Sequence, residues 1–325
     1  MAKRQGGGNY LFESVDNWCK IDIPGVVSDV ATDSNDNVYL AVRTAQAFDA
    51  NTGAILAFDR DGNHLNTFGE DKLRTPHGLW ITPDDTIYLA DTFDHCIRTY
   101  SPNGDPGMVL GVPGEPGPAG SPFNRPTLAV TSPVSDDLFV SDGYRQNRAH
   151  RFSPAGADTE AASSYAHLKR GWENSEWELT ASWGGGDLNY HDDLSWGSTE
   201  KHGTGPGEFL LPHGIAVDNE DRAYVMDRSN DRIQIFDRDG NYLTEWSMPS
   251  PNQGVFDTDG FMHVPGDGRM YILSPDGSEV AVWGERGHEP WQFIGGSHGL
   301  WIDSQGDIYV AQVGIPNAIN KFARI

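Results

Sequence analysis

A repeated unit constrains this chain more than any other feature of its sequence. The unit begins with a small residue, then a variable position, then Gly or Asp. Two apolar residues separated by one other residue come next, and an Asp ends this first part. A turn and an apolar-Tyr-apolar run follow. Six copies can be aligned, and they are VSDVATDSNDNVYLAV from Val27, PHGLWITPDDTIYLAD from Pro76, PTLAVTSPVSDDLFVSD from Pro126, PHGIAVDNEDRAYVMD from Pro212, NQGVFDTDGFMHV from Asn252 and SHGLWIDSQGDIYVAQ from Ser297. Such self-similarity is typical of folds that repeat one supersecondary unit.

Each unit is long enough to hold four strands. A third strand and a turn follow most copies, as in IQIFDRDGNY at Ile233, and a fourth short strand ends the unit, as in YLTEWS at Tyr242. Four strands in about 40–50 residues are typical of a β-propeller blade. The sequence therefore predicts an all-β, six-bladed β-propeller that occupies residues 1–325 as one domain. The last copy has only three strands, so we expect NYLFESV, from Asn9 to Val15, to complete its sheet and close the ring.

One interval between copies is too long for a single blade. The stretch at about 156–208 is rich in Trp, Gly, Asp and Ser and contains one clear strand, from Glu178 to Trp183. Blade three needs that strand as its own outer strand, and no further copy of the motif follows. We therefore expect a long loop insertion here, and not a seventh blade.

Composition limits the partners of the chain. The formal net charge of -24 repels phosphate backbones and anionic lipid, so nucleic acid and membrane partners are not expected. No apolar run approaches the ~18 residues of a membrane span. Cys19 and Cys96 could form one disulfide, but a reduced compartment is the simpler interpretation. The N-terminal MAKRQGGGNY lacks the apolar core of a secretory signal, so we expect a cytoplasmic protein, either a monomer or a weak oligomer.

Three histidines share one position of the repeat. The residues at that position are Ser28, His77, Thr127, His213, Gln253 and His298. One histidine there would be an ordinary turn residue, but histidines on alternate blades are related by about 120° and would converge on the propeller axis. Three imidazoles leave coordination positions open, which is typical of catalytic zinc. The pattern therefore predicts a metal site, although neutral imidazoles also suit copper, iron and nickel.

Further candidates follow the second strand of three blades. Arg43, Tyr144 and Arg228 fall where that strand ends, near the expected metal. Arginine binds carboxylates with two hydrogen bonds, which favours an anionic substrate, and a tyrosine beside a metal can act as a base. The alternative is that Tyr144 and Arg228 are packing or ion-pair residues beside Asp142 and Asp227.

Acidic turns elsewhere faintly resemble calcium loops. DRDGN occurs at Asp59 and at Asp237. These turns lack the spacing and the final glutamate of a calcium loop, so we interpret them as hairpin turns.

The repeats resemble NHL repeats, and the chain resembles the peptidyl-α-hydroxyglycine α-amidating lyases from Val27 to Phe322. The stretches that carry the resemblance are PHGLWITPDDTIYLAD, LFVSDGYRQNRAHRFSP at Leu138 and PGEFLLPHGIAVDNEDRAYVMDRSNDRIQIF at Pro206. The resemblance implies a six-bladed propeller with an axial zinc, a tyrosine base in an SDGY motif, an arginine in a DR motif and a first-blade arginine. These implied residues are His77, His213 and His298 for the zinc, then Tyr144, Arg228 and Arg43.

The chain also departs from that family. The family's structural calcium uses an aspartate directly after the third histidine, where this chain has Gly299. Arg145 and Ala223 occupy positions of the disulfide cysteines found in vertebrate members. The metal site therefore carries over better than the calcium site or the peptide substrate.

The resemblance implies a lyase that breaks the C–N bond of an α-hydroxylated amide and releases an amide and glyoxylate, or a similar carbonyl product. The expected substrate is a small-molecule or peptide-like anion. Two alternatives remain open. One is a metal-dependent hydrolase or another lyase acting on a small anionic substrate, and the other is a non-catalytic NHL propeller that serves as a binding scaffold.

Overall fold

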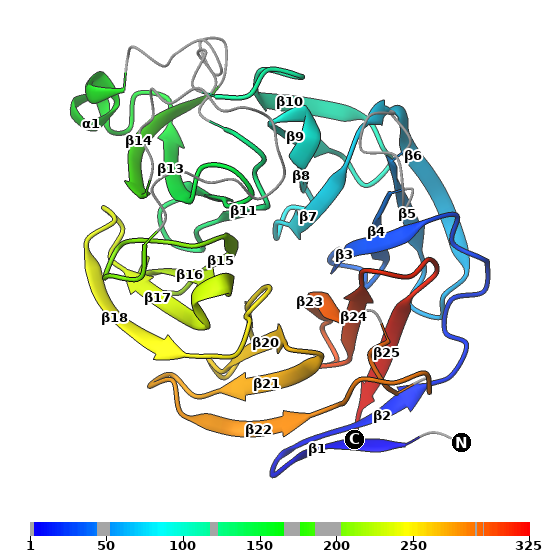
Figure 1. The fold of residues 1–325 in the computed structure, drawn as a ribbon. Coiled ribbons are helices and arrows are strands. Elements are labelled where there is room, and N and C mark those ends of the chain that lie inside the picture. The colour runs from blue at the N-terminus through cyan, green and yellow to red at the C-terminus, as the bar shows by residue number, and fades with distance from the viewer. Residues whose placement is uncertain are drawn as a thin grey trace. The chain divides into compact units, whose positions relative to one another are not determined.

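The computed structural model describes residues 3–43, 53–117, 123–165, 176–185, 203–289, 291–294 and 296–325. These residues form six antiparallel sheets (Figure 1), which are the six blades of a β-propeller. The fold class predicted from the repeat is thereby confirmed. Each blade begins at one copy of the repeated motif, so the sequence period and the structural period coincide.

The strands of the first three blades follow the chain in order. Blade one contains β3 (Val26–Thr32), β4 (Val38–Arg43), β5 (Gly53–Phe58) and β6 (His64–Leu73). Blade two contains β7 (Pro76–Ile81), β8 (Ile87–Asp91), β9 (Cys96–Tyr100) and β10 (Pro106–Gly111). Blade three contains β11 (Leu128–Thr131), β12 (Leu138–Asp142), β13 (Arg148–Pro154) and β14 (Trp177–Gly184).

The remaining blades follow the same plan. Blade four contains β15 (Pro212–Val217), β16 (Ala223–Asp227), β17 (Arg232–Phe236) and β18 (Tyr242–Ser247). Blade five contains β19 (Val255–Phe256), β20 (Met262–Gly266), β21 (Arg269–Leu273) and β22 (Glu279–Trp283). Blade six contains β23 (Ser297–Ile302), β24 (Ile308–Gln312) and β25 (Ile319–Arg324), together with the N-terminal strands β1 (Arg4–Gly7) and β2 (Tyr10–Val15).

Burial decreases from the early strands of a blade to the last strand. In blade four, every residue of β16 and β17 is buried, whereas most of β18 is exposed. Short continuous apolar runs such as AYVMD indicate strands that are covered on both faces. The apolar content of each strand therefore matches its place in the sheet.

The acidic turns are hairpin turns, as predicted. In the turn after β5, the Asp59 carboxylate accepts hydrogen bonds from the backbone N–H groups of Asp61 and Asn63, at 3.0 and 2.8 Å. The Asn63 side chain donates to the same carboxylate at 2.8 Å and lowers the pKa of Asp59. Gly62 adopts a φ of 85°, and a Cβ there would lie 1.8 Å from the carbonyl oxygen of Trp18. The Asp59 carboxylate therefore accepts hydrogen bonds within its own turn, as expected of a hairpin turn.

The N-terminal segment completes blade six, as the free strand in the sequence predicted. Strand β2 pairs with β25 in antiparallel register, and β1, which was not predicted, adds a fifth strand outside β2. Phe12 is fully buried and stacks on Trp283 at 5.3 Å between ring centres. This ring pair stabilises the packing of β2 against β22 of blade five, because aromatic pairs of this kind contribute about 0.5–1.5 kcal/mol beyond area burial.

The inserted stretch contributes one predicted strand and one helix that was not predicted. Strand β14 pairs with β13 as the outer strand of blade three. Helix α1 (Thr159–Ser164) begins after Asp158, whose carboxylate accepts a hydrogen bond from Ala161 N at 3.3 Å, as an N-cap does. The rest of the predicted loop, at 166–175 and 186–202, lies outside the described residues.

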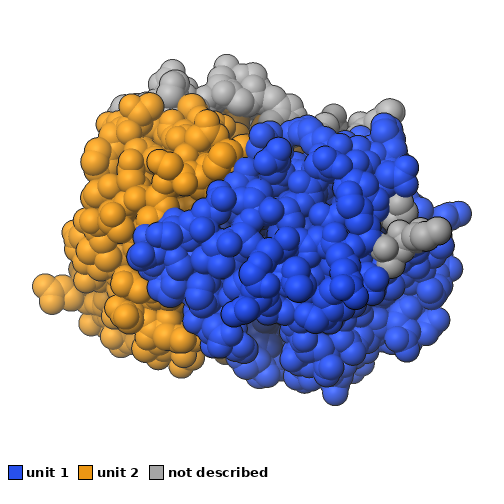
Figure 2. Space-filling model, turned by 90° about the horizontal axis from the view of Figure 1, so that it is seen from below, with its two compact units in different colours: residues 1–87, 101–104, 251–325 blue, residues 88–100, 105–250 orange. Residues whose placement is uncertain are grey.

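The chain divides into two compact units, coloured separately in Figure 2. Unit 1 comprises residues 1–87, 101–104 and 251–325, and unit 2 comprises residues 88–100 and 105–250. Cys19 and Cys96 are both free thiols. Within the described part of the chain, no helix is both long enough and apolar enough to span a bilayer.

Candidate metal centre

His77 and His298 lie at equivalent positions in unit 1. Each is the second residue of the first strand of its blade, β7 and β23. Their side chains are buried, with relative exposures of 2 % and 5 %. The two rings lie 4.9 Å apart between centres at an interplanar angle of 75°. Two histidines at equivalent positions of the repeat therefore lie next to each other in the structure.

His213 occupies the same position in unit 2, as the second residue of β15. It is 3 % exposed, and its Nε2 lies 3.1 Å from the hydroxyl oxygen of Tyr144. Tyr144 follows β12 by two residues and is itself buried. Gly143 permits this contact, because a Cβ there would lie 2.0 Å from the carbonyl oxygen of Pro212.

One ligand nitrogen from each of the three histidines lies within 4.8 Å of the other two. No other group of three or more His, Cys, Asp or Glu side chains converges in this way among the described residues. The Nδ1 of His298 is 2.7 Å from the carbonyl oxygen of Ser28. Because a carbonyl only accepts, Nδ1 carries the proton and Nε2 keeps its lone pair for a ligand, an arrangement common in metal-binding histidines. The three neutral imidazoles fit a transition metal.

Arg228 accompanies Tyr144 and His213 in unit 2. It begins the 3-10 turn η3 (Arg228–Asn230), and its backbone N–H donates to the carbonyl of Leu211 at 3.2 Å, two residues before His213. Its guanidinium carbon lies 6.0 Å from the centre of the Tyr144 ring, within cation–π range. Arg228, Tyr144 and His213 therefore lie close together in unit 2.

The neighbouring aspartates have partners of their own. Asp227 forms an ion pair with Arg232 at 2.9 Å, and Asp142 accepts hydrogen bonds from the Gln146 side chain at 2.6 Å and from Asn124 N at 2.7 Å. Both aspartates therefore have partners other than Tyr144 and Arg228, and the two interpretations of Tyr144 and Arg228 stay predictions.

Arg43 lies on a different blade from Tyr144 and Arg228. It is the last residue of β4, is half-buried and pairs with Val26 on β3. Ser28, which contacts His298, lies two residues beyond that pair. The catalytic roles of Arg43, Tyr144 and Arg228 remain predictions.

The position after the third histidine has no room for a side chain. A Cβ on Gly299 would lie 2.1 Å from a carboxylate oxygen of Asp29. That fully buried carboxylate accepts hydrogen bonds from Leu79 N at 2.7 Å and Val30 N at 2.8 Å. Burial raises the pKa of Asp29 well above its ordinary value, although these donors act in the opposite direction. An aspartate at position 299 does not fit, so the family's calcium site is not reproduced there.

Asp29 was missed as a notable residue in the sequence, although a signal was present. Blade one carries aspartate where blades two, four and six carry glycine after the histidine. A carboxylate at a position otherwise held by glycine indicates a change in packing, and here it fills the space beside Gly299.

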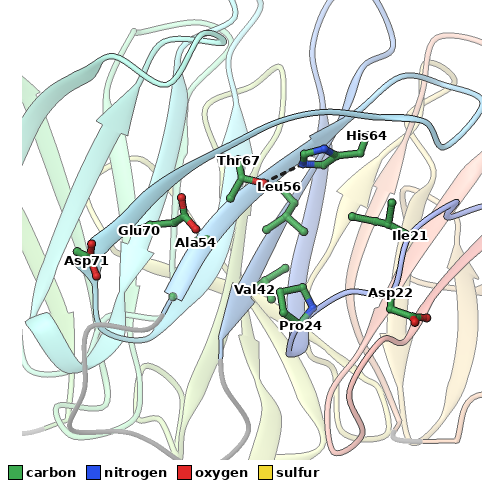
Figure 3. A pocket seen from close by; sticks show the side chains of 11 residues that line it. Ile21, Asp22, Pro24, Val42, Ala54, Leu56, His64, Thr67, Glu70 and Asp71 are labelled. Atoms are coloured by element: carbon green, nitrogen blue, oxygen red, sulfur yellow. Dashed lines mark hydrogen bonds between the residues drawn. The ribbon is translucent and has the colours of Figure 1, made fainter.

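A separate pocket lies on blade one, away from the repeat position of the histidines. It has a volume of about 510 Å³, and its lining includes Ile21, Leu56, His64, Glu70 and Asp71 (Figure 3). The His64 ring is hydrogen-bonded to Thr67 at 2.8 Å. The histidines of the candidate metal centre are not among its lining residues.

Comparison with known proteins finds one matching repeat and a shared fold. An NHL repeat family model matches residues 209–236, which include β15 to β17 and His213. Blade four thus contains an NHL repeat, and the six blades make the fold a β-propeller. A gluconolactonase from Xanthomonas campestris has the same fold, with a TM-score of 0.62 and 11% identity over 98% of this chain and 91% of its own.

The chain is similar to amidating enzymes, as its motifs predicted. The peptidylglycine alpha-amidating monooxygenase of Rattus norvegicus is 27% identical over 80% of this chain and 25% of its own length. The peptidyl-alpha-hydroxyglycine alpha-amidating lyase 1 of Drosophila melanogaster is 24% identical over 70% of this chain and 37% of its own length. The chain thus spans between a quarter and two fifths of these two relatives. The similarity supports a family of propeller enzymes.

Proposed function

We propose that this protein is a metal-dependent lyase that cleaves the C–N bond of an α-hydroxylated amide and releases an amide and glyoxylate, or a similar carbonyl product. The observation that carries the proposal is the Tyr144 hydroxyl, 3.1 Å from a nitrogen of one of three converging, buried histidines. The Drosophila relative is named a lyase for α-hydroxyglycine substrates, which supports the same chemistry.

The proposed metal ligands are His77, His213 and His298. A bound transition metal would supply Lewis acidity to the substrate oxygens. The imidazoles leave coordination positions for those oxygens. Burial of all three rings keeps bulk water from competing for the site and strengthens electrostatic interactions within it.

Tyr144 is the proposed base. Without a metal, its hydroxyl and the lone pair of His213 Nε2 can share a hydrogen bond. A ligand role uses the same lone pair, so metal binding would free the phenol oxygen to face the substrate. Acting as the phenolate, the tyrosine would accept the proton of the substrate hydroxyl as the C=O bond forms and the C–N bond breaks. It would then pass the same proton to the leaving amide nitrogen, so the phenolate is regenerated and the reaction balances without an oxidant.

Arg228 is the proposed carboxylate-binding residue. Its backbone is anchored two residues before His213, which limits the reach of its side chain to the region of the tyrosine. A guanidinium can bind a carboxylate through two parallel hydrogen bonds. It would hold the acid group of an α-hydroxyglycine and later that of glyoxylate. Arg43 is a second candidate for this role on blade one.

Two measurements on the same purified protein test the proposal. Mass spectrometry should find one metal ion per chain, and incubation with α-hydroxyhippurate should release glyoxylate and benzamide. His213→Ala should lose both properties. His64→Ala, which removes an exposed histidine outside the repeat position, should keep both.

The outcomes separate the competing functions. Bound metal without glyoxylate release would favour a hydrolase or another lyase acting on a small anion. The absence of metal from the wild-type protein, or an unchanged metal content in His213→Ala, would overturn the proposal and favour a binding propeller.

A further inference from the structure

Side chains from the blades without a histidine hold the backbone before each histidine. In each case the acceptor is the carbonyl oxygen of the residue that precedes the histidine, and the donor lies in or just before the first strand of the preceding blade. The pairs are Ser28 Oγ to Pro76 O at 2.7 Å, Thr127 Oγ1 to Pro212 O at 3.3 Å and Asn252 Nδ2 to Ser297 O at 2.9 Å. Each pair lies within one compact unit.

Two adjacent residues bracket His77. Ser28 binds the carbonyl before it, and the Asp29 carboxylate accepts the N–H of Leu79, two residues after it, at 2.7 Å. Ser28 also contacts a second histidine, because its own carbonyl accepts Nδ1 of His298 at 2.7 Å. Both Ser28 and Asp29 are almost fully buried, so water does not compete for these bonds.

His298 is bracketed in the same way by blade five. The Asn252 side chain donates to the carbonyl of Ser297, and the Gln253 side chain accepts the N–H of Leu300 at 2.7 Å. Leu300 follows His298 by two residues, as Leu79 follows His77. Different side chains thus make equivalent contacts around two histidines.

His213 has one half of this arrangement. Thr127 binds the carbonyl of Pro212, but the next residue is Leu128, which has no polar side chain to reach the backbone beyond the histidine. The single Thr127 hydroxyl proton is shared between Pro212 O at 3.3 Å and Ser141 O at 3.0 Å, and the hydroxyl also contacts that of Ser141 at 2.7 Å. Here the ring itself is contacted by Tyr144.

We propose that Ser28, Thr127 and Asn252 are positioning residues, which set the ligand geometry of the histidines by fixing the peptide before each one. This inference rests on the proposed metal site and adds a role for the blades that lack histidine. Hydrogen bonds that orient metal ligands typically change metal affinity by about 10- to 100-fold when they are removed. Blades two, four and six would then supply the metal ligands, and blades one, three and five would supply the side chains that position those ligands.

A pair of variants at Thr127 separates positioning from packing. Thr127→Val keeps the volume and loses the hydroxyl, whereas Thr127→Ser keeps the hydroxyl and loses a methyl group. Metal affinity, measured by competition with a chelator, should fall about 10-fold in Thr127→Val and by less in Thr127→Ser. The absorption spectrum of the Co²⁺-loaded protein should change only in Thr127→Val. A purely structural role predicts the reverse order, because Ser leaves a cavity.

Ser28→Ala and Asn252→Ala extend the test, and Thr92→Val is the matched control. Ser28→Ala should reduce affinity the most, up to about 100-fold, because the hydroxyl that it removes makes the shortest of the three contacts, at 2.7 Å. The backbone carbonyl that accepts from His298 stays in place in this variant. Thr92 Oγ1 donates to the carbonyl of Pro126 at 2.8 Å, before Thr127 and not before a histidine. Thr92→Val should therefore keep its affinity within about threefold, since it leaves the peptides before the ligands in place.

The outcomes distinguish this inference from the proposed function. If the wild-type protein binds metal and all three positioning variants bind it equally well, the inference is overturned while the proposed function stands. If the wild-type protein binds no metal, the proposed function fails, and nitrogen NMR signals of the imidazoles in the metal-free protein decide the inference. Thr127→Val should then alter the His213 signals and Thr127→Ser should not, and identical spectra would overturn it.

Discussion

Replacing Gly143 with alanine should disconnect Tyr144 from His213. A Cβ on Gly143 would lie 2.0 Å from the carbonyl oxygen of Pro212, 2.7 Å from its carbonyl carbon and 3.1 Å from its nitrogen. All three atoms belong to the backbone at the start of β15, so no side-chain rotation relieves the clash. The substitution must push apart the segment that carries Tyr144 and the strand that carries His213.

The size of the effect follows from these distances. A contact below 3.0 Å is essentially never seen for a real Cβ, so the two segments must separate by at least 1.0 Å. That shift would lengthen the contact of 3.1 Å between Tyr144 and His213 beyond hydrogen-bonding range. Overpacking of this kind costs about 1–3 kcal/mol. A displacement of about 1 Å at a reacting group can lower kcat/KM about 100-fold.

The assay combines urea unfolding with turnover of α-hydroxyhippurate. Gly143→Ala should unfold at lower urea and lose most of its activity. Gly7→Ala is the control, because its Cβ would meet nothing nearer than 3.8 Å, and it should be neutral in both assays. Wild-type stability and activity in Gly143→Ala would refute the argument that close backbone approach positions the tyrosine.

Three further perturbations test separate parts of the molecule. Tyr144→Phe should lower kcat about 100-fold or more with full metal content, and wild-type kcat would exclude the tyrosine as the base. Arg228→Lys should raise KM about 10-fold because a point charge replaces a bidentate donor, and an unchanged KM would assign carboxylate binding elsewhere. Complete burial lowers the pKa of His150 below its ordinary 6.5, against the effect of Asp142. On acidification, His150 is protonated at a higher pH in the unfolded chain than in the folded chain. Its contribution to the free energy of unfolding is therefore complete above about pH 6.5 and is lost as the pH falls towards the folded pKa. His150→Gln should flatten that decline in urea titrations, and an identical pH profile would contradict it.

Local pattern was enough to predict the blades. Alternating apolar residues, Asp-Gly turns and the recurring motif specify strand, turn and strand within each copy, because these signals act over a few residues. The strand from Glu178 to Trp183 and the pairing of NYLFESV with blade six followed from the same reasoning. Helix α1 was not predicted, because a helix of six residues is too short to show a helical period in the sequence.

By itself, the sequence determined which residues share a repeat position, and it therefore singled out His77, His213 and His298. Only the tertiary structure decided what surrounds them. The contact between Tyr144 and His213 joins residues 69 positions apart, and the contact between Ser28 and His298 joins residues 270 positions apart. Such contacts depend on side-chain directions across different blades, which a repeat period does not encode. The exclusion of any side chain at Gly299 by Asp29 has the same origin, since close packing between strands distant in sequence exists only in the folded chain.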